Sequence, residues 1–162
     1  MKRSAVVLAA ATAWVIGAPL AHAASATVTL NGQNIPVNGQ VSCATTEAGF
    51  TLEMGHDAGS AWVEIGNSPS YSHQPTAVTR VQINDLSDAT YEWQPSQQLT
   101  NGNAHYQGPS DPNAHSAGSY KITGQIPLIF VPSYPAPGAP PPIGGSIPSP
   151  SLLPFEIDAT CP

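Results

Sequence analysis

Residues 26–43 read ATVTLNGQNIPVNGQVSC, and their alternation of apolar and polar side chains decides the fold class. Val28 and Leu30 lie on one face, directly before Asn31-Gly32, a dipeptide typical of two-residue hairpin turns. The same phase then returns beyond the turn, at Ile35, Val37, Val41 and Cys43. We therefore expect this stretch to fold as a β-hairpin.

The period-two pattern recurs along the chain, in residues 50–54, 61–65, 77–83, 90–94 and 119–126. No mature segment carries apolar residues at the helical spacing, and 14 glycines and 18 prolines would interrupt most candidate helices. We expect an all-β protein, with an antiparallel sheet curled or folded as a sandwich or an open barrel. The pattern does not choose between these two architectures.

Two segments interrupt the strand pattern. Residues 95–118 are long and polar, with a short candidate strand at 104–107. Residues 127–154 contain ten prolines and predict a protruding loop before the last strand, partly in the polyproline II conformation. Its first apolar members are expected to keep the start of the loop on the protein body: Leu128, Ile129, Phe130, Val131 and Tyr134.

The N-terminus has the pattern of a secretory signal peptide. Lys2 and Arg3 precede an apolar run, and the run ends at a small-residue site, Ala21-His22-Ala23. We expect cleavage after residue 23, with an uncleaved anchor as the alternative. Residues 24–162 are then long enough for a single domain with its own core.

The charge of the mature chain excludes some partners. Removing the leader leaves two basic residues against ten acidic ones, a net charge of −8. A chain this acidic is a poor partner for nucleic acid and for anionic lipid surfaces. No transmembrane helix is expected once the leader is removed.

The two cysteines predict a disulfide. Exported proteins reach compartments where disulfides persist, and only one pairing within the chain is possible. Cys43 follows the apolar face of the first hairpin, and Cys161 follows that of Phe155 and Ile157, so we expect both to point inward. The bond would tie the first hairpin to the last strand. A reactive thiol and a metal-binding pair are the alternatives, although neither cysteine has a CxxC partner.

Three motifs resemble the mycobacterial 19-kDa (LpqH-type) lipoprotein antigen family: VTLNGQNIPVNGQVSC at 28–43, YKITG at 120–124 and FEIDATC at 155–161. Their order and both cysteine positions match over 27–161, strongly at both ends and weakly between 50 and 118. The resemblance implies an exported, surface-displayed envelope antigen of actinobacterial type, in a membrane-associated family with no established enzymatic activity.

Two features depart from that family. Its lipoproteins carry a cysteine at the leader junction, whereas residues 17–26, GAPLAHAASA, contain none. We therefore expect a secreted or loosely envelope-associated protein without a lipid anchor. The proline-rich loop is also longer than the segment that usually joins these strands in the family.

The sequence offers only weak candidates for a catalytic or metal site. Loop histidines near Asp57 would suit zinc if they converged, but no HxH or HxxxH spacing brings them together: His56, His73, His105 and His115. Glu53, Asp57 and Glu64 flank one predicted turn, where an outward acidic sheet edge is favoured over an acid–base pair. No hydrolase or phosphate-binding motif is present. We expect no enzyme, cofactor or metal.

Aromatic and proline residues are the better contact candidates. Trp62 and Trp93 fall in phase with strands and are expected in the core or in cross-strand pairs. The contact candidates are the loop tyrosines and the proline run: Tyr71, Tyr106, Tyr134, Pro140, Pro141 and Pro142. The chain is thus interpreted as a non-catalytic envelope antigen or, alternatively, as a binding module for an envelope glycan, a lipid or a host protein.

Overall fold

The computed structural model describes residues 24–46, 49–66, 78–95, 102–108, 118–132, 136–144 and 151–161. The expected leader and its cleavage site lie outside these residues. The described part is all-β: β1 Ser25–Leu30, β2 Gln33–Ile35, β3 Val41–Thr46, β4 Gly49–Met54, β5 Ser60–Ile65, β6 Val78–Asn84, β7 Thr90–Trp93, β8 Asn103–Gln107, β9 Gly118–Phe130 and β10 Leu152–Cys161. Within these ranges no helix is long and apolar enough to cross a membrane.

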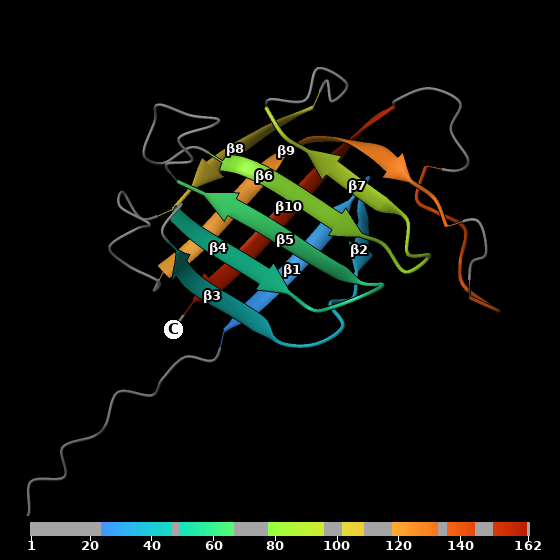
Figure 1. Ribbon diagram of the computed structural model, residues 1–162, viewed down its shortest axis with the longest axis horizontal. Coiled ribbons are helices and arrows are strands. Elements are labelled where there is room, and N and C mark those ends of the chain that lie inside the picture. The colour runs from blue at the N-terminus through green and yellow to red at the C-terminus, as the bar shows by residue number, and fades with distance from the viewer. Residues whose placement is uncertain are drawn as a thin grey trace, which may run out of the picture.

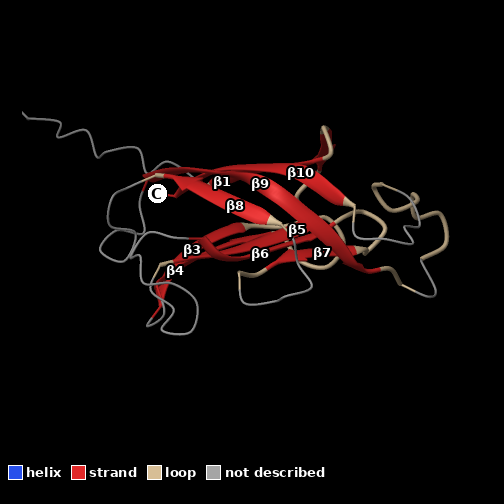
Figure 2. Cartoon of the chain, turned by 90° about the horizontal axis from the view of Figure 1, so that it is seen from above, coloured by secondary structure: helices blue, strands red, loops and turns tan. Residues whose placement is uncertain are grey.

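The strands form one continuous antiparallel sheet that is folded into two layers. Its order is β2-β1-β10-β9-β7-β6-β5-β4-β3, and β8 pairs separately with β9. One layer contains β1, β2, β8 and β10, and the other contains β3 to β7 (Figures 1 and 2). The sheet is not closed into a barrel, because its two ends, β2 and β3, do not pair. The all-β prediction is confirmed.

β9 connects the two layers. Its first part pairs with β10 from Gly118 to Pro127, and its last part pairs with β7 at Leu128 and Phe130. The long strand therefore passes from one layer to the other, as Figure 2 shows. A register shift beside β7 accompanies this crossing, as expected where a strand bends between layers.

The first hairpin is shorter than predicted. β1 and β2 pair around Asn31 and Gly32, whose φ angles of 50° and 74° fit a turn that needs two left-handed residues. Val41 and Cys43 do not continue this hairpin, however. They belong to β3, which pairs with β4 at the far end of the sheet order, because the chain leaves the first layer after Ile35.

The bounds predicted for the proline-rich loop are also wrong at both ends. β9 continues through Pro127, which lies opposite Leu152, and β10 contains Pro154. The connection between these strands is therefore 131–151. The first part stays on the protein body, as predicted, because β9 pairs with β7 there and Leu128 packs against the core. The side chains of Ile129, Phe130 and Val131 do not contribute, since they are 48%, 53% and 42% exposed.

The core fills the space between the two layers. β1, β9 and β10 contribute one wall, and β4 to β7 contribute the other. Phe50 on β4 stacks on Tyr120 of β9, with ring centroids 4.9 Å apart and planes 14° from parallel. This contact joins the layers through side chains, and such aromatic pairs are favourable beyond the area they bury.

β8 is packed closely on β9. A Cβ placed on Gly124 would lie 2.0 Å from the Asn103 carbonyl oxygen, so only glycine permits this approach. The strand prediction for 104–107 is confirmed and extended by Asn103. His105 and Tyr106 lie on this strand, although they were also grouped with the loop histidines and loop tyrosines.

Candidate functional site

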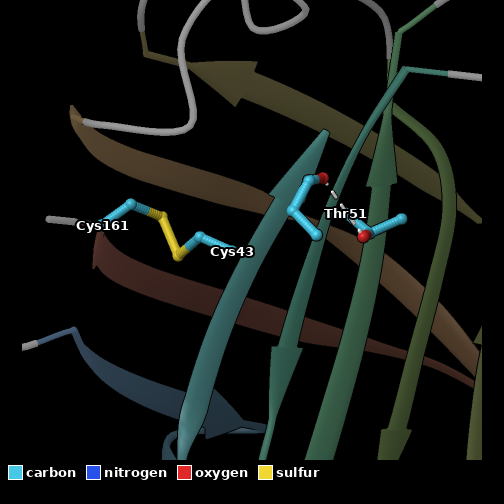
Figure 3. Close-up of a disulfide and its surroundings, with 4 residues drawn as sticks. Cys43, Thr51 and Cys161 are labelled. Carbon is cyan, nitrogen blue, oxygen red and sulfur yellow. Dashed lines mark hydrogen bonds between the residues drawn. A yellow bond between two sulfur atoms is a disulfide. The ribbon is translucent and has the colours of Figure 1, made fainter. Parts of the chain in front are cut away.

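The disulfide predicted from the two cysteines is present. Cys43 and Cys161 are bonded with their Cα atoms 6.0 Å apart (Figure 3). Cys161 is buried, as predicted, but Cys43 is only half-buried. The bond ties β3 to β10, not the first hairpin to the last strand, because Cys43 lies on β3. Beside it, the Thr51 hydroxyl donates to the Ala44 carbonyl oxygen at 3.3 Å and supports the β3–β4 pairing.

The histidine candidates are not brought together where they are described. The His56 Nδ1 atom lies 3.2 Å from Asp57 Oδ2, and both side chains are largely exposed. His105 lies on β8. His73 and His115 are outside the described residues. Within the described ranges, no three histidine, cysteine or acidic side chains are placed to hold a metal ion.

Two of the acidic candidates, Glu53 and Glu64, lie on interior strands rather than on a sheet edge, and the third, Asp57, lies in the turn between those strands. Glu53 on β4 is opposite Trp62, and Glu64 on β5 is opposite Thr51 and Arg80. The predicted edge position is therefore wrong, because β3 and not β4 is the end strand of the sheet, although Glu53 does face outward as predicted. The exposed turn residue Asp57 contacts His56 instead.

The outer face of the β5–β7 region carries a cation–aromatic cluster. The Arg80 guanidinium lies 5.0 Å from the Trp62 ring centroid, and Arg80 Nε donates to Glu92 Oε1 at 2.7 Å. The Gln94 amide also contacts Glu92. Glu92 is 7% exposed, so these partners compensate a buried carboxylate. Trp93 is in the core as predicted, whereas Trp62 makes cross-strand contacts.

Of the three tyrosine candidates, the structure describes only Tyr106. Tyr106 is half-buried and packs with its ring 6.0 Å from that of Tyr120. Burial raises the pKa of both phenols, that of Tyr120 to about 12 with a further contribution from Tyr106. Tyr71 and Tyr134 lie outside the described residues.

A buried polar cluster at the β6–β7 turn escaped the sequence analysis. Asp85 is 1% exposed, and its Oδ2 atom accepts hydrogen bonds from the Ile143 amide at 2.9 Å and the Tyr91 hydroxyl at 3.1 Å. The same hydroxyl lies 2.6 Å from the Ile143 carbonyl oxygen. Burial, and then the Asp85 charge, raises the pKa of Tyr91 above its usual range. The only local signal is the spacing of Asp85 and Ser87, which suits an aspartate-capped turn.

This cluster anchors the proline run that was singled out as a partner contact. Pro140 and Pro141 are exposed on one side and, with Ile143, line a cavity of about 130 Å³. Its other walls are Gln33–Ile35 and Asp85–Ser87. Pro142 is half-buried. This part of the loop therefore lies against the domain and does not protrude freely.

Exposed apolar side chains collect near the same part of the fold. Among the described residues the large exposed ones are Leu86 in the β6–β7 turn and Ile129, Phe130 and Val131 at the end of β9. A run of this kind is a candidate contact surface.

A second hollow lies at the other end of the sheet. It has a volume of about 470 Å³ and is lined by β1, β9, β10 and the end of β8, including Lys121 and Asp158. The Lys121 ammonium bridges Glu156 at 2.5 Å and Asp158 at 3.4 Å. The hollow is open, and its charged groups are already paired with one another or with Glu156.

Comparison with known families gives a match over most of the chain. The family described as Mycobacterium 19 kDa lipoprotein antigen matches residues 19–134, a range that includes β1 to β9. β10, with the FEIDATC motif and Cys161, lies beyond the matched range. No curated protein matches the chain significantly. Because well over half of the sequence is matched, the chain belongs to the Mycobacterium 19 kDa lipoprotein antigen family.

Proposed function

We propose that this protein is an exported, non-catalytic antigen domain of the cell envelope, released without a lipid anchor. Membership of a lipoprotein antigen family supports an envelope or exported location. The observation that carries the proposal further is the Cys43–Cys161 disulfide, since such bonds persist in oxidising compartments and are rare in the cytosol. The absence of cysteine from residues 17–26 supports release without acylation.

The test is expression of the full chain in a mycobacterial host, followed by fractionation and intact mass spectrometry. We expect the exported protein to begin at Ala24, to carry no acyl group and to contain no free thiol. The matched control is the chain from Ala24 onward without its leader, which should stay in the cytosol with Cys43 and Cys161 reduced. An acylated product, or two free thiols on the exported protein, would overturn the proposal.

A second candidate function is a binding module. The exposed run Ile129–Val131, next to the proline-rich connection, favours it because large apolar patches on monomers often mark contact surfaces. The partner classes are an envelope glycan, a lipid or a host protein. Deleting residues 132–150 is a poor test, because it also removes the Ile143 contacts with Asp85 and Tyr91.

Point variants separate binding from folding. Phe130→Ser should lower retention of the protein on isolated cell walls while leaving the unfolding midpoint unchanged, because Phe130 is 53% exposed. Thr46→Ser, an exposed change on the distant edge strand β3, is the matched control and should retain normal association. Equal retention of both variants and the unchanged protein would exclude this surface.

A further inference from the structure

Ile143 is bound by the protein at both of its backbone polar groups. Its amide donates to Asp85 Oδ2 at 2.9 Å, and its carbonyl oxygen accepts from the Tyr91 hydroxyl at 2.6 Å. Asp85 and Tyr91 are 58 and 52 residues away in sequence. Ile143 opens a turn with Gly144, whose φ is 89°, so the protein holds this backbone at two points where the segment changes direction.

The binding groups are held in place by their own turn, independently of Ile143. The second carboxylate oxygen, Asp85 Oδ1, accepts from the Ser87 amide at 2.8 Å and the Ala89 amide at 3.2 Å. The Asp85 amide in turn donates to the Ala89 carbonyl oxygen at 3.1 Å. These bonds direct Asp85 Oδ2 toward the segment that contains Ile143. The carboxylate oxygen is therefore oriented to accept a hydrogen bond before any peptide binds.

The residues before Ile143 explain why this amide is the one selected. Pro140, Pro141 and Pro142 have no backbone N–H, so Ile143 supplies the first donor after the run. A proline run is also stiff and loses little conformational entropy on binding. The cavity of about 130 Å³ beside Pro140 and Pro141 shows that this segment does not fill the available space.

We propose that Asp85, Tyr91 and the edge of β2 form a peptide-binding site, that residues 136–144 occupy it as a tethered ligand, and that its external ligand is a proline-rich peptide with an aliphatic residue after the prolines. The proline segment is then a ligand of its own domain, and an external peptide must displace it. The inference goes beyond the proposed function and does not depend on where the protein resides.

The tethered state is tested by amide hydrogen exchange of the full mature domain, followed by NMR. The Ile143 amide should be protected in the unchanged protein. Tyr91→Phe keeps the bond from the Ile143 amide to Asp85 but removes the hydroxyl that holds the Ile143 carbonyl, so the segment should open more often. The Ile143 amide should then exchange about tenfold faster, the effect of one lost hydrogen bond on the opening equilibrium. Tyr120→Phe, at a buried tyrosine on β9, is the matched control and should leave Ile143 unchanged. An Ile143 amide that exchanges as fast as a free peptide would overturn the proposal.

The external ligand is tested with a variant in which 136–144 is replaced by a glycine–serine segment of the same length. The probe is the synthetic peptide APGAPPPIG, the sequence of 136–144, and the control peptide is APGAPPPPG, which lacks the isoleucine amide. We expect the probe to shift the Asp85 and Tyr91 resonances saturably in the variant, and at least tenfold more weakly in the unchanged protein, where the tether competes. A variant with native sheet resonances that binds neither peptide at millimolar concentration, or both equally, would refute the site.

Discussion

Cys43 and Cys161 join strands of opposite layers, with their Cα atoms 6.0 Å apart. Cys43 lies on the edge strand β3, and Cys161 ends β10. The backbone connects the layers through β9, which pairs with strands of both. The disulfide adds a covalent link at β3, the end strand of the sheet among the described residues.

Breaking this bond should destabilise the domain substantially. The bonded cysteines are 118 residues apart, and cross-links over long loops typically add about 2–5 kcal/mol to the free energy of unfolding. Urea unfolding of oxidised and reduced protein measures the difference. The Cys43→Ala/Cys161→Ala variant should match the reduced protein and ignore reductant, whereas identical midpoints for oxidised and reduced protein would contradict the prediction.

Two phenylalanines allow a matched comparison of core and surface. Phe50 is fully buried against Tyr120, so Phe50→Ala should lower the free energy of unfolding by about 3–5 kcal/mol. Phe130 is 53% exposed, so Phe130→Ala should change the free energy of unfolding by less than about 0.5 kcal/mol. Chemical denaturation of both variants gives the values, and similar losses for the two would be evidence against the described core.

The Arg80–Glu92 ion pair should contribute more to the free energy of unfolding than the ion pairs of Lys121 with Glu156 and Asp158. Glu92 has a side chain only 10% exposed, so Arg80→Ala leaves a buried carboxylate poorly compensated and should cost about 1–3 kcal/mol. Adding Glu92→Gln should recover part of that loss, because the uncompensated charge is then gone. Lys121→Ala breaks solvent-exposed pairs and should have a smaller effect. Thermal unfolding of all three variants decides the order, and a larger loss for Lys121→Ala would reverse it.

Stability should fall at alkaline pH. Burial raises the pKa of Tyr120 to about 12, while a tyrosine in the unfolded chain ionises near pH 10. Between these values the unfolded state has lost a proton that the native state keeps, so the free energy of unfolding decreases as pH rises. Unfolding midpoints measured at pH 9 and pH 11 should show this drop, and Tyr120→Phe should reduce it. A drop of the same size in that variant would assign the effect elsewhere.

The strands were predictable because each has one face in the core and one in solvent. Alternation placed β1, β4, β5, β6 and β10 close to their observed bounds, and two cysteines in a chain with an export signal predicted the disulfide. The partner of β3 was not predictable in this way. Val41 continues the phase of Ile35, but phase carries no information on which layer a strand joins.

Long-range polar contacts were out of reach for a related reason. Nothing near Ile143 in the sequence indicates that its amide meets Asp85, since the two are joined only through the folded sheet. Prolines are unusual within strands, yet Pro127 and Pro154 both lie in paired strands. Each proline removes only the one backbone hydrogen bond that its missing N–H would have donated. The short strand at 104–107 was predicted, but His105 and Tyr106 were also treated as loop residues because the segment around that strand is long and polar.

The pairing of Ser25 with Thr160 puts both ends of the domain at one pole of the sandwich. The β6–β7 turn, the end of β9 and the segment 136–144 lie toward the opposite pole, as Figure 1 shows. Anything that holds this domain by either terminus will therefore orient it. The exposed apolar side chains at the end of β9 and the proline segment 136–144 will face away from the point of attachment, toward whatever approaches from outside.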